Sequence, residues 1–345
     1  MMSGSPVPGR HPHRPAGRGV DRGRGSSEAM AAGEDRIHDL LIVGAGPAGV
    51  SCALQAARDG LDLALVGDEP VGGLLPAARR IDNLAGLPGV AGRELAGRLA
   101  RQLAARGVLV RRGRVVALRR ADGLFRAALA DGTPLAARTV CLATGTRPRP
   151  WPPGTGRNTP RDARDWPDDL HGRRAVVAGG GEAAFDTALT ARDRGAHALV
   201  LVRGPVPRAG RGLLDEARRL GVAWRVDTEV TGLRGAPGSW EVETADGSRI
   251  ATDEFAACVG REPRRELLDD LGAPDLAPSV ASPEVPGLFR AGDLIRGRQR
   301  YVATALGDGQ RAALAAREFL EGCASTDRAP TGRKTARASA AGRVE

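Results

Sequence analysis

The 345-residue sequence lacks several features that would place it in a specialised class of protein. Aromatic residues make up only 3%, too few for a protein that binds single-stranded nucleic acid by stacking. Four cysteines do not make a disulfide scaffold, and no apolar run reaches the roughly 18 residues that span a bilayer. What remains is a globular composition, 41% hydrophobic, on a chain long enough for about two domains.

Lysine is also nearly absent, since Lys334 is the only one among 51 basic residues, and the net charge is +10. Residues 1–37 and 322–345 are rich in Arg, Gly, Pro and Ser, and both are predicted to be disordered tails. The first has no apolar core of a secretory signal. Its Arg-Gly run would also suit weak binding to nucleic acid or a membrane surface, and Met30 is an alternative start. We predict a cytoplasmic protein with no membrane span and no specific nucleic-acid partner.

One pattern occurs twice along the chain. An apolar run at 40–43 leads into GAGPAG (44–49), a stretch with helical spacing and a second apolar run at 63–66. The second copy begins with an apolar run at 175–178, which leads into GGGEAA (179–184). Another helical stretch and an apolar run at 198–202 follow. Alternating stretches with hairpin turns follow each copy, at 109–145 and 222–260. Each copy is therefore predicted to be a βαβ unit followed by a β-meander.

The glycines in these copies have a specific chemistry. Gly44 permits a tight turn, Gly46 lets the backbone approach a pyrophosphate, and Gly49 lets the helix pack closely on the strand. The helix N-terminus then faces the phosphates with its partial positive charge. One such motif is weak evidence, but two in a strand–motif–helix context predict two dinucleotide sites.

The residue after the second strand of each copy helps to choose the nucleotide. In the first copy Gly67 stands where an acid is usual, and Asp68 is either a ribose ligand or a loop residue. In the second copy Arg203 follows the strand, with Arg208 close behind, which favours the 2′-phosphate of NADPH over NADH. NADH stays an alternative because Arg is abundant everywhere in this chain.

Further motifs make residues 38–321 resemble the thioredoxin-reductase-like branch of the FAD/NAD(P)H pyridine nucleotide-disulfide oxidoreductases. The segments that carry the resemblance are GAGPAG, GGLL (72–75), IDNLAGLPG (81–89), LATGTRPR (142–149), GGGEAA, VGREP (259–263), AGDL (291–294) and RYVATALGDG (300–309). The FAD contacts that it implies are Gly44, Gly46, Pro47, Ala48, Gly49, Asp68, Gly73, Leu74, Asn83, Ala143, Thr144, Gly145, Gly292, Asp293, Arg300, Tyr301 and Val302. The NAD(P)H contacts are Gly179, Gly181, Glu182, Ala183, Ala184, Asp186, Arg203, Arg208 and Gly260.

The resemblance implies an α/β fold with two Rossmann-like, three-layer ββα domains. The FAD-binding domain would comprise 38–149 and 261–321, with the NAD(P)H-binding domain inserted at 150–260. The crossover segments near 148–150 and 260–263 would be hinges. Relatives are commonly homodimers, so a homodimer is expected.

The chain departs from this family in its cysteines. Thioredoxin reductases carry a Cys-x-x-Cys just before the second glycine motif, whereas residues 146–178 contain no cysteine. Cys52, Cys141, Cys258 and Cys323 are all far apart in sequence. Reduction of a disulfide by the family mechanism needs a dithiol beside the flavin. Cys52 is a candidate thiol at a helix N-terminus, but small core packing is the favoured interpretation.

The remaining candidates are Tyr301 and Asp186. Tyr301, the only tyrosine, would stack on the flavin. Asp186 would either contact the nicotinamide or be an exposed helix acid. No metal-ligand spacing is present. The leading hypothesis is an oxidoreductase that passes hydride from NADPH to FAD and on to a ferredoxin, flavodoxin, quinone or other small acceptor. The alternatives are a disulfide reductase using another thiol, a non-catalytic flavin or nucleotide sensor, and a nucleic-acid binder acting through its tails.

Overall fold

The computed structural model describes residues 36–151, 159–273, 279–282 and 284–327. Its larger sheet has the strand order β3-β2-β1-β6-β5-β4, with β16 also pairing with β6. The strands are β1 (Ile37–Val43), β2 (Leu63–Gly67), β3 (Val110–Arg112), β4 (Val115–Ala121), β5 (Leu124–Leu129), β6 (Pro134–Leu142) and β16 (Leu288–Arg290). Strand β1 pairs in parallel with β2 and β6, while β4, β5 and the start of β6 form the predicted antiparallel meander.

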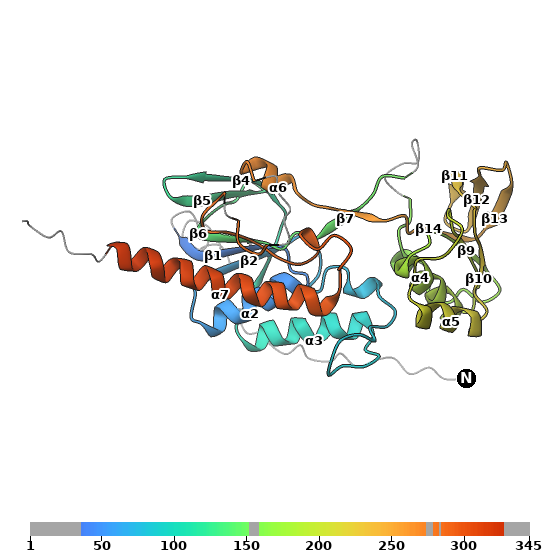
Figure 1. Ribbon diagram of the computed structural model, residues 1–345, viewed down its shortest axis with the longest axis horizontal. Helices are drawn as coiled ribbons and strands as arrows, with labels where there is room; N and C mark the ends of the chain where they lie inside the picture. Colours follow the sequence, from blue (N-terminus) through green and yellow to red (C-terminus); the bar gives the residue numbers. More distant parts are fainter. Residues whose placement is uncertain (1–35, 152–158, 274–278, 283, 328–345) are drawn as a thin grey trace, which may run out of the picture. The chain divides into compact units, whose positions relative to one another are not determined.

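Helices cover one face of this sheet (Figure 1). They are α2 (Pro47–Arg58), α3 (Gly92–Ala105) and α7 (Val302–Asp327), and the short η1 (Leu75–Ala77) and η3 (Gly292–Leu294) lie in the connections. Helix α2 begins with a proline at a position where the missing N–H costs nothing, and it ends before Gly60, whose φ of +78° suits glycine. On the other face, the meander and α6 (Glu266–Asp270) enclose a second apolar cluster.

The second glycine motif lies in a four-stranded parallel sheet of order β10-β9-β8-β14. Its strands are β8 (Arg174–Ala178), β9 (His197–Leu201), β10 (Ala223–Arg225) and β14 (Glu254–Ala257), and its helices are α4 (Glu182–Asp193) and α5 (Arg211–Arg219). A meander of β11 (Val230–Ala236), β12 (Ser239–Thr244) and β13 (Arg249–Thr252) forms a separate sheet, and η2 (Ala163–Asp165) precedes β8. The arrangement repeats that of the first copy on a smaller scale.

The two segments predicted to connect the domains pair with each other. Strand β7 (Thr146–Pro148) leaves the larger sheet and β15 (Arg261–Pro263) returns to it, and they form a two-stranded antiparallel ribbon. After β15 the chain rejoins the larger sheet through β16, which pairs with the end of β6. The predicted fold class, α/β with two Rossmann-like units, is confirmed, and the path of the chain supports the predicted insertion of the second unit into the first.

The two predicted tails fall mostly outside the described residues, which exclude 1–35 and 328–345. Helix α7, however, continues to Asp327, although the prediction ended the folded part at 321 and placed Cys323 on the tail. The helix runs on because 322–327 contains one glycine and no proline, and the next proline is Pro330. Across the described ranges, no helix is both long enough and apolar enough to cross a membrane.

Candidate dinucleotide sites

The first glycine motif forms the turn between β1 and α2. Gly44 has a φ of +109°, and a Cβ there would come within 2.3 Å of the Ala143 carbonyl oxygen. A Cβ on Gly49 would lie 1.8 Å from the Gly44 carbonyl oxygen. Gly46, in contrast, has no atom within 4 Å of its missing Cβ. The outer glycines therefore allow close packing, and the middle one leaves the open space that a pyrophosphate needs.

The start of α2 is free to accept a phosphate. Its N-cap residue is Gly46, which provides no side chain to cap the first turn. Gly73 lies against this turn, since a Cβ on it would be 3.3 Å from the Gly46 Cα. The N–H groups of an uncapped helix start, with the helix dipole behind them, form an anion site. These residues fit the pyrophosphate of FAD.

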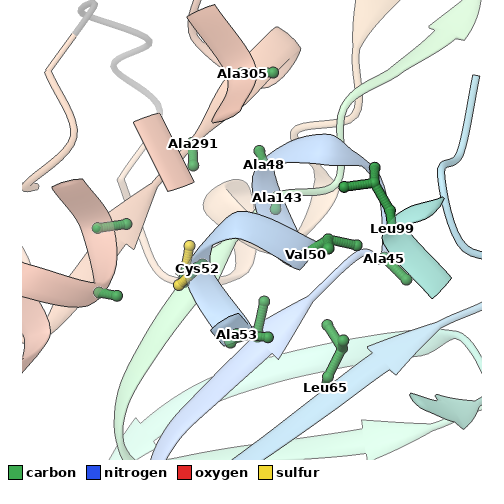
Figure 2. Close-up of a cluster of buried hydrophobic side chains, with 14 of the residues drawn as sticks. Ala45, Ala48, Val50, Cys52, Ala53, Leu65, Leu99, Ala143, Ala291 and Ala305 are labelled. Atoms are coloured by element: carbon green, nitrogen blue, oxygen red, sulfur yellow. The ribbon is translucent and has the colours of Figure 1, made fainter. Parts of the chain in front are cut away.

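Segments from the C-terminal part of the chain close over α2. Gly292 has a φ of +71°, and a Cβ there would be 2.8 Å from the Ala48 Cβ, while one on Gly309 would be 1.9 Å from the Ala48 carbonyl oxygen. Figure 2 shows Ala48 near Ala143, with Ala291 and Ala305 on the segments that approach it. The small side chains let η3 and α7 lie directly against the first turn of α2.

Asp293, the acid of the predicted AGDL motif, sits in this closed region. Burial raises the pKa of its carboxyl, while the guanidinium groups of Arg300 and Arg261 act in the opposite direction. Within the described ranges its carboxylate makes no hydrogen bond. Asp293 is half-buried, so its carboxylate is accessible and is a suitable ligand for polar groups such as the ribityl hydroxyls of FAD.

The other predicted FAD residues lie on this side of the sheet or on its edge. Ala143 is buried at the end of β6, the Thr144 hydroxyl donates to the Arg264 carbonyl oxygen, and Gly145 accepts from the Arg264 N–H. Leu74 is half-buried and Asn83 is exposed in the turn between Ile81 and Val90. Their roles stay predictions.

Asp68 has a partner that the sequence did not indicate. The Arg264 guanidinium lies 3.5 Å from the Asp68 carboxylate and 3.3 Å from that of Glu69. Arg264 immediately follows the Gly-x-x-Pro segment, but one Arg among fifty carried no signal. The pair ties the returning chain to the end of β2, and Asp68 is still 38% exposed and available to a ribose.

The second glycine motif repeats this geometry with one difference. Gly179 has a φ of +148°, and a Cβ on it would be 2.4 Å from the Cys258 carbonyl oxygen. Gly181 is open, and as N-cap of α4 it provides no capping side chain. The third position is Ala184, which is fully buried, where the first copy has Gly49. Glu182 accepts a hydrogen bond from the Gly210 N–H, and Ala183 is exposed.

The two arginines proposed to read the nucleotide are accessible. The Arg203 side chain is 77% exposed, with Glu229 at 3.8 Å as its ion-pair partner. Arg208 is exposed, and its N–H donates to the Gly180 carbonyl oxygen at 2.6 Å, which places it beside the glycine turn. Gly260 accepts from the Arg149 N–H where the chain leaves this unit.

Asp186 is not the exposed helix acid that one interpretation allowed. Its carboxylate accepts from the Arg79 N–H at 2.8 Å, and the Arg79 side chain binds Asp193 and Glu216. Burial raises the pKa of Asp186 to about 6, against the lowering effect of Arg79. Arg79 was not predicted, because the contact joins residues more than 100 positions apart.

The cysteines and Tyr301 differ in how far their side chains are exposed to solvent. Cys52 and Cys141 are fully buried, and the pKa of Cys52 is raised well above its usual value by its contact with the Cys141 thiol and by burial. Burial also raises the pKa of Cys258, to about 12. Tyr301 is 47% exposed, just before the first residue of α7, Val302. Arg300 donates to the Arg261 carbonyl oxygen.

Comparison with known proteins identifies the family. The model of the pyridine nucleotide-disulphide oxidoreductases matches residues 38–309, and the chain therefore belongs to this family. A thioredoxin reductase of Mycolicibacterium smegmatis is 29% identical over 303 residues, which cover 82% of this chain and 97% of that protein. A ferredoxin–NADP reductase of Salinispora tropica is 31% identical over 304 residues, which cover 78% and 90%.

Solved structures agree on the fold. The thioredoxin reductase of Lactococcus lactis in its FR conformation has a TM-score of 0.73 at 24% identity, and the match covers 83% of this chain and 99% of that one. The chain is thus an FAD-dependent NAD(P)H oxidoreductase of the thioredoxin-reductase-like type. When bound, FAD supplies the hydride chemistry, and the protein binds and orients the two nucleotides.

Proposed function

We propose that this enzyme passes the electrons of NADPH, through FAD, to an acceptor that needs no dithiol on the enzyme. Ferredoxin, flavodoxin or a quinone would qualify. Each NADPH delivers a hydride, which carries two electrons, and these leave singly to two one-electron carriers or together to a quinone. The preference for NADPH is supported by two exposed arginines, Arg203 and Arg208, beside the second glycine turn.

One observation carries the proposal. The sequence from 146 to 178 has no cysteine, and the thiol nearest to the first glycine motif, Cys52, is fully buried with a raised pKa. A thiol attacks a disulfide as its thiolate and must reach the substrate. Cys52 meets neither condition, so the alternative of a non-CxxC disulfide reductase loses its best candidate.

The localisation, oligomeric state and partner of the enzyme are also proposals. A small redox protein as the acceptor is supported by relatives named as ferredoxin–NADP reductase and thioredoxin reductase. A cytoplasmic homodimer, or a small-molecule acceptor, is part of the same proposal. The proposal of a flavin or nucleotide sensor predicts the same sites but no turnover with any acceptor.

The test is a screen of acceptors with NADPH in excess under anaerobic conditions. Ferredoxin, flavodoxin, a soluble quinone and oxidised thioredoxin are offered in turn, and NADPH oxidation is followed at 340 nm. We expect turnover with at least one of the first three and none with thioredoxin, and the Cys52→Ser variant should match the wild type. Steady thioredoxin reduction that is lost in Cys52→Ser would contradict the proposal.

A further inference from the structure

Asp308, on the first turns of α7, is among the most buried charged groups of the described chain. Its side chain is 1% exposed. It accepts from the Gly292 N–H at 3.3 Å, from the Arg296 Nε at 2.6 Å and from the Arg311 guanidinium at 2.5 Å. Burial alone would raise the pKa of Asp308, but the hydrogen bonds from the two arginines prevail and lower it. The carboxylate is therefore ionised and fully paired at neutral pH.

Two of these partners, Gly292 and Arg296, flank Asp293. Arg296 is itself 86% buried, since its side chain is only 14% exposed, and it lies at the end of the same turn as Gly292. Asp308 thus holds both ends of the η3 turn. It accepts from the Gly292 N–H at the start of the turn and from the Arg296 side chain just after its end. Asp293 lies between these two anchoring points.

The place of this anchor in the fold gives it a consequence. Gly292 and Gly309, the neighbour of Asp308, both lie so close to Ala48 that neither position has room for a Cβ. Ala48 is on the first turn of α2, two residues after the open Gly46. A shift of the η3 turn would therefore move Asp293 relative to the helix start that binds the pyrophosphate.

We propose that Asp308 is a positioning residue for FAD, which fixes the Gly292–Arg296 turn so that the Asp293 carboxylate faces the cofactor. Asp308 does not touch FAD itself. The Arg296 and Arg311 guanidiniums compensate its buried charge. This proposal rests on the proposed role of Asp293 as an FAD ligand, but not on the identity of the electron acceptor.

The test compares two matched variants of the purified holoenzyme. Asp308→Asn keeps the shape of the side chain but removes its charge. Asp59→Asn is the control, because Asp59 also pairs with an α7 arginine, Arg317 at 3.5 Å, and its side chain is 10% exposed. Asp59 lies at the far end of α2, away from the η3 turn. The readouts are the visible circular dichroism of the flavin and the rate of FAD release after dilution.

We expect Asp308→Asn to release FAD about tenfold faster and to alter the flavin dichroism, since hydrogen bonds to charged groups are strong. Asp59→Asn should lower the melting temperature without changing either readout. If Asp308→Asn also changed only the melting temperature, the residue would be merely structural and the proposal would be wrong.

A second variant covers failure of Asp308→Asn to fold. Arg311→Gln removes one partner whose side chain is 61% exposed, while Gly292 and Arg296 stay in place. A smaller acceleration of FAD release, about two- to threefold, is expected, and an unchanged rate would overturn the proposal. These outcomes are independent of the acceptor screen, which uses only the wild type and Cys52→Ser.

Discussion

The two glycine turns begin alike and then differ in how much of the chain surrounds them. In each, the first glycine lies against a carbonyl oxygen at the end of a neighbouring strand. A Cβ on Gly44 would be 2.3 Å from the Ala143 carbonyl oxygen, and one on Gly179 would be 2.4 Å from that of Cys258. The first turn is then enclosed by η3 and α7, with Gly292 and Gly309 pressed on Ala48. At the second turn the contacts come from loop backbone instead, since the Arg208 N–H donates to the Gly180 carbonyl oxygen and the Gly210 N–H to Glu182. Arg203 beside it is 77% exposed.

This difference separates a resident cofactor from one that must exchange. A cofactor that stays through many turnovers gains from tight packing, whereas NADPH has to enter and leave in each cycle. The third motif position differs too, since a Cβ on Gly49 would lie 1.8 Å from the Gly44 carbonyl oxygen, whereas the second copy accommodates the Cβ of the buried Ala184. We interpret the first site as built for retention of FAD and the second for release of NAD(P)⁺.

The largest expected effect comes from filling the tighter of the two turns. Gly49→Ala places a Cβ 1.8 Å from the Gly44 carbonyl oxygen, so the backbone must move. The variant should lose about 3 kcal/mol or more of stability and be purified without flavin. Ala184→Gly is the matched change in the second copy and should cost only about 1 kcal/mol. Denaturant unfolding and the flavin absorbance measure both, and equal losses would remove the contrast between the sites.

The middle glycines allow a sharper comparison. Neither Gly46 nor Gly181 has an atom within 4 Å of its missing Cβ, so alanine fits the protein at both positions. Gly46→Ala should therefore weaken FAD retention, and Gly181→Ala should raise the KM for NADPH about tenfold or more while flavin content stays normal. If either substitution impaired both nucleotides equally, the assignment of one nucleotide to each motif would be wrong.

Nucleotide choice is expected to depend on the exposed arginines. Arg203→Ser removes a charge that would face the 2′-phosphate and should raise the KM for NADPH about tenfold, with little change for NADH. Arg225→Ser is a control from the neighbouring strand β10, where the side chain is also exposed. Steady-state kinetics with NADPH and with NADH give the KM values of both variants. A parallel change in the two KM values would point to a general loss of binding.

A further expected effect is a pH dependence of stability at Asp186. Its pKa is raised from 3.8 to about 6 by burial, so the folded protein binds this proton more tightly than the unfolded chain. The carboxyl's contribution to stability is thus present below about pH 4 and is lost as the pH rises to about 6. Asp186→Asn should gain roughly 1–3 kcal/mol relative to the wild type across this range. A constant difference in unfolding free energy from pH 4 to 7 would contradict this.

The parts of the molecule that the sequence predicts are those encoded by local pattern. The glycine turns, the helices after them and the Asp122-Gly123 hairpin follow from short motifs, and Asp122 and Gly123 adopt the positive φ values, 53° and 76°, that such a turn needs. The Arg79–Asp186, Arg264–Asp68 and Arg296–Asp308 contacts were not predictable. In a chain with fifty arginines, composition does not indicate which arginine meets a distant acid, and only the folded topology does so.

The central claim is that one chain holds two working dinucleotide sites that exchange a hydride. The most direct test is anaerobic stopped-flow mixing of the purified protein with NADPH and then with NADH, with flavin absorbance followed near 450 nm. We predict rapid bleaching with NADPH and slower bleaching with NADH. A protein that holds no flavin, or a flavin that neither nucleotide reduces, would contradict the account and favour a sensor built on the same scaffold.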